Sequence, residues 1–153
     1  MKKIITLTLL ISCFFVGFSQ ESVKEKIDLN WEQSFKVALK KSKKEKKPVL
    51  IYFTGSDWCT PCKILDKKLF HTKKFKDLSD KDFILYEADN PRNKDLLTLN
   101  KRKENNKLIR KYKVKSYPTL VVVNHRGKMI AYKSGLILTE YYYPFFQSVL
   151  DNY

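Results

Sequence analysis

The sequence predicts a single α/β domain, and three observations carry this prediction. The chain has 153 residues and is 43% apolar, which suits one domain with one continuous core. Short apolar runs rich in β-branched and aromatic residues alternate with stretches of helical periodicity. The run at 48–53 ends in a turn, and a helix begins directly after that turn, as in an α/β unit.

The first predicted helix follows a short polar lead-in at residues 20–30. Asn30 is the predicted N-cap, with Gln33 three residues further on. The helix presents one apolar stripe formed by Trp31, Phe35, Ala38 and Leu39. Its last part is rich in lysine, and it ends before Pro48.

The next element is the buried strand at 48–53, which ends at the turn 54–57. A helix then begins with Cys59 and Cys62, and Pro61 is tolerated in its first turn because no N–H is needed there. Apolar residues recur at helical spacing along it at Ile64, Leu65, Leu69 and Phe70.

The remainder of the chain is predicted to continue the alternation of strands and helices. Pro144 conflicts with an uninterrupted last helix, so we expect a kink or a start near Tyr143. Residues 90–107 are polar and basic and are interpreted as an insertion, either a partner-docking loop or, by default, a solvated helix extension. The other predicted elements are a helix at 71–79, a strand at 83–88, a helix ending at 108–112, strands at 119–123 and 128–133 around a turn at 125–127, and a helix at 139–152.

The two cysteines indicate redox chemistry. A helix N-terminus stabilises an anion through its free N–H groups and its dipole, which lowers the pKa of a thiol placed there. Cys59 is therefore the predicted nucleophile. Cys62 lies about one turn further along, close enough for a disulfide, and is the predicted resolving thiol.

The motif Trp58-Cys59-Thr60-Pro61-Cys62, the strand before it and Ser116-Tyr117-Pro118-Thr119 before a second apolar run resemble the thioredoxin superfamily. The resemblance runs from about residue 31 to 152 and is strongest to exported bacterial thioredoxin-like proteins and the periplasmic C-terminal domain of the reductase DsbD. It implies a thioredoxin fold, with a mixed central β-sheet flanked by α-helices. It also implies a cis-proline at Pro118 beside the dithiol, and substrate binding by Trp58, Tyr117 and Pro118.

The sequence departs from typical thioredoxins at the proton acceptor for the resolving thiol. A buried Asp near the end of the central strand is replaced here by Tyr52 or Phe53. Asp66 lies four residues after Cys62, on the same helical face, and matches an acidic residue of the DsbD-type domains. Asp66 is therefore the candidate substitute, with a solvated surface carboxylate as the equal alternative.

The N-terminus predicts export. Two lysines followed by an apolar stretch to Phe18 are typical of a signal peptide, which we place at residues 1–19. The lead-in at 20–30 and the thioredoxin-like domain at 31–153 follow it. Lipidation of Cys13, in a sequence similar to a lipoprotein cleavage box, is the less favoured alternative. Cleavage lowers the formal net charge from +15 to +13 and leaves two cysteines, both in the motif. We expect a periplasmic or envelope location.

Two other functions of a basic chain with a Cys pair are disfavoured. Nucleic-acid binding fits neither export nor lysines spread over several helices. A zinc site would need further ligands, and His71 and His125 match no usual spacing. We therefore expect no metal and no cofactor apart from the redox-active Cys59–Cys62 pair.

The predicted function is that of an envelope thiol-disulfide oxidoreductase, acting mainly as a reductase of protein disulfides. Its expected partners are disulfide-containing proteins and a membrane thiol electron donor, with the protein itself a monomer. Two alternatives remain: a reductase for cytochrome c maturation, and a non-catalytic module that binds peptides beside Pro118.

Overall fold

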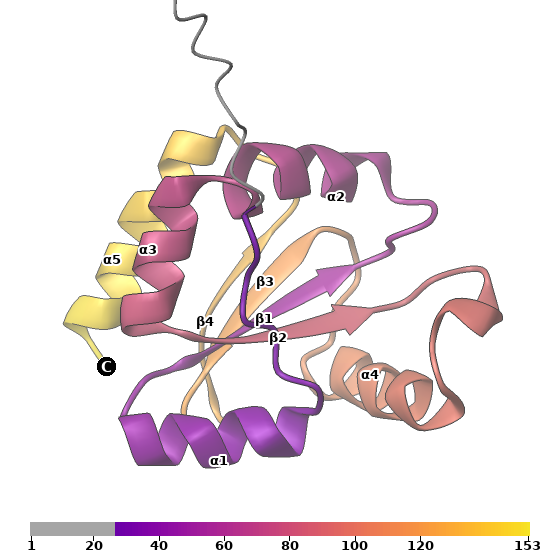
Figure 1. Cartoon of the computed structure of the whole chain (residues 1–153), viewed down its shortest axis with the longest axis horizontal. Coiled ribbons are helices and arrows are strands. Elements are labelled where there is room, and N and C mark those ends of the chain that lie inside the picture. The colour runs from indigo at the N-terminus through magenta and orange to yellow at the C-terminus, as the bar shows by residue number, and fades with distance from the viewer. Residues whose placement is uncertain (1–26) are drawn as a thin grey trace, which may run out of the picture.

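The computed structural model describes residues 27–153 of the chain (Figure 1). The predicted signal peptide at 1–19 and the candidate lipidation site Cys13 lie outside the described residues. No helix within 27–153 is both long enough and apolar enough to cross a membrane.

A mixed sheet of four strands in the order β2-β1-β3-β4 forms the centre of the domain. The central strand β1 (Val49–Thr54) pairs in parallel with β2 (Ile84–Asp89) and antiparallel with β3 (Thr119–Val123). Strand β4 (Met129–Ser134) completes the sheet antiparallel to β3. The predicted mixed central sheet is confirmed.

Helices cover both faces of the sheet (Figure 1). One face carries α1 (Phe35–Glu45) and α4 (Leu99–Lys111). The other carries α2 (Thr60–Leu65), which continues into the π-helix η1 (Asp66–Phe70), with α3 (Lys73–Asp82) and α5 (Tyr142–Asp151). Two short 3₁₀ helices, η2 (Lys94–Leu96) and η3 (Thr139–Tyr141), lie in the connections.

Alternation along β1 divides its side chains between the two cores. Leu50 and Tyr52 pack on the side of the dithiol, together with α2, α3 and α5. Val49, Ile51 and Phe53 pack on the opposite side against α1 and α4. Because both faces of β1 are buried, its sequence is continuously apolar rather than alternating.

The predicted start of the first helix was wrong. Ser34, not Asn30, is the N-cap, since its side chain accepts a hydrogen bond from the Val37 N–H. Trp31 lies before the helix and forms a β-bridge with Leu85 at the edge of the sheet. The apolar spacing of Trp31 suits a helix, but pairing with the sheet also gives this segment backbone hydrogen bonds. The Glu32 N–H, for example, donates to the Leu85 carbonyl.

Other boundaries moved by smaller amounts. The helix predicted at 71–79 is α3, capped by Thr72, whose hydroxyl accepts from the Phe75 N–H. The second half of residues 90–107 belongs to α4, as the helix interpretation predicts, and the first half contains only the short helix η2; a role in partner docking stays a prediction. The last α-helix begins at Tyr142 after η3, which confirms the expected start near Tyr143 and puts Pro144 in the first turn.

Candidate active site

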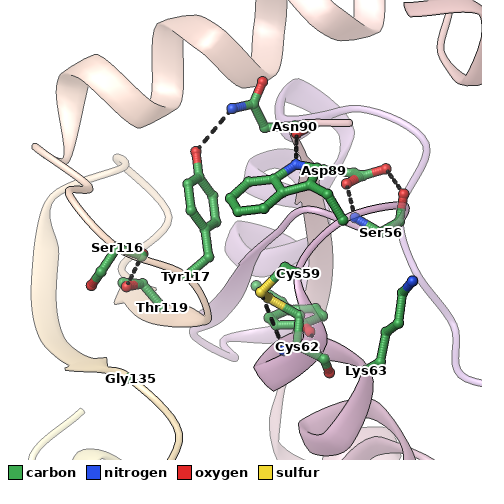
Figure 2. The surroundings of a disulfide bond; sticks show 12 residues. Ser56, Cys59, Cys62, Lys63, Asp89, Asn90, Ser116, Tyr117, Thr119 and Gly135 are labelled. Atoms are coloured by element: carbon green, nitrogen blue, oxygen red, sulfur yellow. Dashed lines mark hydrogen bonds between the residues drawn. A yellow bond between two sulfur atoms is a disulfide. The ribbon is translucent and has the colours of Figure 1, made fainter. Parts of the chain in front are cut away.

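Cys59 and Cys62 lie where β1 passes into α2, and they are joined by a disulfide with a Cα–Cα distance of 5.2 Å (Figure 2). Cys59 is the N-cap residue of α2, and the Cys62 N–H donates to its sulfur at 3.2 Å. Reduction of the bridge would leave the Cys59 sulfur beside this N–H and the positive end of the helix. Both features stabilise a thiolate.

The turn before Cys59 is held by backbone hydrogen bonds and by a close approach of Gly55 to an indole. The N–H groups of Trp58 and Cys59 both donate to the Gly55 carbonyl, at 3.1 and 2.7 Å. A Cβ on Gly55 would overlap the indole ring of Trp58. Glycine at this position therefore lets Trp58 fold back over the turn.

Asp89, at the end of β2, holds the same turn from the neighbouring strand. Its carboxylate accepts from the Ser56 N–H at 2.9 Å and from the Ser56 hydroxyl at 2.6 Å (Figure 2). On the outer side, the Asp57 carboxylate accepts from the N–H groups of Arg92 and Asn93, and these bonds hold the pKa of Asp57 below its usual range. Two carboxylates thus fix the loop that presents Cys59.

Asn90 connects the dithiol loop to the proline loop. Its carbonyl accepts from the Trp58 indole N–H at 2.9 Å, and its side-chain amide donates to the Tyr117 hydroxyl at 3.1 Å (Figure 2). The rings of Trp58 and Tyr117 meet edge to face, with 5.5 Å between centroids. Trp58 and Tyr117, which both pack against the core that contains the dithiol, are therefore held in a fixed relation.

The Tyr117–Pro118 peptide bond is cis, which confirms the geometry expected from the resemblance. Pro118 is buried, and its carbonyl accepts from the Gly135 N–H at 2.8 Å, so the start of β3 is tied to the end of β4. The predicted substrate-binding residues Trp58, Tyr117 and Pro118 thus come together with the disulfide in one place. Their role in binding a substrate stays a prediction.

Tyr52 occupies the region where typical thioredoxins carry a buried Asp. Its side chain is fully buried, and its hydroxyl donates to the carbonyl of Cys62 at 3.2 Å. Burial raises the pKa of Tyr52 further above its usual value, so this hydroxyl stays protonated at neutral pH. Tyr52 can support the helix backbone but cannot take a proton from Cys62.

Asp66 is partly buried rather than a fully solvated surface carboxylate. Its backbone N–H donates to the Cys62 carbonyl, and burial raises the pKa of its carboxyl, with the charge of Asp89 adding to the effect and His71 opposing it. A partly buried carboxyl one turn after Cys62 fits a proton acceptor. That role stays a prediction.

The sequence did not predict two site residues: Asp89, the last residue of β2, and Asn90, directly after it. The signal that could have found them is the parallel pairing of β1 with β2, because the carboxyl ends of parallel strands meet at one edge of a sheet. Within 27–153, no group of three or more His, Cys, Asp or Glu side chains is arranged to hold a metal ion.

Comparison with known proteins connects this arrangement to a family. Residues 35–149 match the family described as Thioredoxin-like domain. The disulfide bond reductase DsbH of Chlamydia pneumoniae is 35% identical over 104 residues, which cover 68% of this chain and 61% of that protein. The thioredoxin-related protein DsbJ of the same organism is 27% identical over 128 residues, covering 84% of this chain and 36% of DsbJ. The chain thus matches less than two thirds of the length of either relative.

A solved structure of a DsbH oxidoreductase has the same fold. It superimposes with a TM-score of 0.73 at 30% identity, covering 88% of this chain and 92% of the solved chain. A thioredoxin from Thermus thermophilus aligns with a TM-score of 0.63 at 18% identity, a likeness of fold alone.

Proposed function

The chain belongs to the thioredoxin-like family, and from this premise we propose that it is a thiol-disulfide oxidoreductase that works through Cys59 and Cys62. The observation that carries the proposal is the Cys59–Cys62 pair at the start of α2, with Trp58 and Tyr117 packed against the same core and each other and a cis peptide bond between Tyr117 and Pro118. This arrangement combines an activated thiol, a second thiol within bonding distance and a place for a substrate chain.

The proposed reaction has two exchange steps. In the first, the Cys59 thiolate attacks one sulfur of a substrate disulfide, forming a mixed disulfide and releasing the other substrate sulfur as a thiolate. In the second, Cys62 loses its proton and attacks the Cys59 sulfur, which releases the remaining substrate thiolate. The substrate gains two electrons, the protein is left with the Cys59–Cys62 bridge, and the two released thiolates take up protons.

Asp66 is proposed as the acceptor of the Cys62 proton in the second step. It is partly buried, and its pKa is raised towards the range in which a carboxylate takes up a proton efficiently. Tyr117 and Pro118 are proposed to bind the substrate chain next to the sulfur under attack, together with Trp58, whose ring packs against Tyr117.

The proposed direction is reduction of protein disulfides. The relative DsbH carries the name of a disulfide bond reductase, and the partly buried carboxyl group of Asp66 lies one turn after Cys62 in this chain, where a negative charge disfavours a thiolate. The expected reduction potential lies nearer about −250 mV than the −120 mV of a strong disulfide donor. A reductase used repeatedly needs an electron source, so we propose a membrane thiol donor of the DsbD kind and an exported, periplasmic location.

Turnover tests the proposal. The protein should catalyse dithiothreitol-driven reduction of insulin, and the Cys59→Ser variant should not. The non-catalytic alternative, in which the pair is a static bridge, predicts no turnover. A reductase dedicated to cytochrome c maturation would prefer an oxidised CxxCH peptide to insulin, so rates on these two substrates separate the narrow function from the general one.

A further inference from the structure

A carboxyl group that the proposed reaction does not use lies on the dithiol side of the sheet. Side chains alternate along β2, so Leu85, Glu87 and Asp89 point to the same face. Leu85 packs in the core that contains Cys59 and Cys62. Glu87 therefore extends from the edge strand towards the core behind the disulfide.

Glu87 is separated from Cys62 by one side chain. The strand register places it directly opposite Tyr52, whose hydroxyl donates to the Cys62 carbonyl at 3.2 Å. Asp66 approaches the same place from η1, and its charge raises the pKa values of both Glu87 and Tyr52. Strand and helix thus bring two carboxyl groups together behind the dithiol.

No neighbour neutralises this charge. Within 27–153, the side chains of Glu87 and Asp66 form no ion pair within 4.0 Å and accept no hydrogen bond, whereas Asp89 is bonded to Ser56. The positive charge of Lys101, in α4, lowers the pKa of Glu87, but burial and the charges of Asp89 and Asp66 outweigh this effect. The result is a partly buried carboxyl with a pKa of about 7.

We propose that Glu87 is a positioning residue for the dithiol, whose negative charge disfavours the thiolate forms of Cys59 and Cys62 and biases the pair towards giving electrons away. The inference rests on the proposed oxidoreductase function and concerns its regulation by pH. The reduced protein can carry a thiolate and the disulfide carries none, so a nearby carboxylate disfavours the reduced form more than the oxidised one. Because Glu87 gains its charge near neutral pH, the bias strengthens as the pH rises through that range.

Alkylation of the fully reduced protein with iodoacetamide tests this without a disulfide substrate. The rate of labelling of Cys59, followed by peptide mass, reports the thiolate fraction at each pH. Glu87→Gln should label at the wild-type rate at about pH 5.5, where Glu87 is protonated, and at least about threefold faster at about pH 8, where it is charged. Glu87→Asp, which keeps the charge, should follow the wild type more closely than Glu87→Gln does.

Glu45→Gln is the matched control, since Glu45 is exposed on α1 on the opposite face of the sheet. It should reproduce the wild-type profile. Equal rates for wild type and Glu87→Gln at every pH, or an equal acceleration by Glu45→Gln, would overturn the role of Glu87. The proposed function fails separately, if wild-type protein with normal labelling of Cys59 reduces no protein disulfide.

Discussion

Glu87→Gln should stabilise the fold at neutral and alkaline pH. The surroundings of Glu87 raise its pKa from 4.5 to about 7, with burial as the largest cause and the charges of Asp89 and Asp66 adding to it. Between these two values the folded protein binds a proton that the unfolded chain has lost. Stability therefore falls as the pH rises through this window.

The size of the effect follows from the same values. Each pKa unit corresponds to about 1.4 kcal/mol, so the ionised Glu87 destabilises the fold by up to about 3 kcal/mol above pH 7. A glutamine side chain has nearly the same shape as glutamate and no charge, so the Glu87→Gln variant should escape this cost. At about pH 4, where Glu87 is protonated in both states, the two proteins should be equally stable.

Urea unfolding of the oxidised proteins between about pH 4 and pH 8 measures the difference, because an intact disulfide removes the thiols from the titration. With a slope of about 1–3 kcal/mol per M urea, the midpoint of the variant should move up by about 1 M or more at pH 8. Glu45→Gln should show no such pH-dependent gain. A wild type as stable as Glu87→Gln at pH 8 would refute the assignment of a destabilising charge to Glu87.

Three further predictions concern residues around the dithiol. Gly55→Ala should lower the stability of the fold and slow the attack on protein disulfides, because the added Cβ would displace the Trp58 indole. Thermal unfolding measures the first effect and insulin reduction measures the second. Asn90→Ala removes the hydrogen bond to Tyr117 but keeps the carbonyl that binds Trp58, so it should cost about 1 kcal/mol in stability. Its rate should fall severalfold on protein disulfides and stay unchanged on a small aromatic disulfide, whereas equal losses on both would argue against a role in substrate positioning. Asp66→Asn should slow release of the mixed disulfide near neutral pH and recover at higher pH, as measured by stopped-flow; an unchanged pH profile would remove Asp66 from the proton transfer.

The parts of the fold that could be predicted from sequence are those fixed by local pattern. The strand Thr119–Val123 was predicted at its observed bounds, because a short β-branched run between a proline loop and a turn admits few other structures. The dithiol loop could be placed for the same reason, as the strand, turn and helix around Cys59 are contiguous. The helix start at Asn30 failed because Trp31 pairs with Leu85 at the sheet edge, a contact between segments far apart in the sequence.

The same distinction applies to the candidate site. Cys59 and Cys62 were predicted from their motif, but Glu87 and Asn90 depend on strand register and on loop contacts between distant segments. In the sequence, Glu87 is a polar residue within an apolar strand and Asn90 is a polar residue after that strand. Only the parallel pairing of β2 with β1 brings these two residues near the dithiol. Asn90 was interpreted as the start of an insertion for this reason.

Cys59 attacks the substrate and Cys62 resolves the mixed disulfide in the proposed reaction, and trapping of the mixed disulfide tests these different roles most directly. Reduced Cys62→Ser and Cys59→Ser proteins are each mixed with a disulfide-containing protein, quenched with acid and separated under non-reducing conditions. Cys62→Ser should accumulate a covalent complex through Cys59, released by dithiothreitol, and Cys59→Ser should form none. A complex that forms with Cys59→Ser and not with Cys62→Ser would contradict these roles.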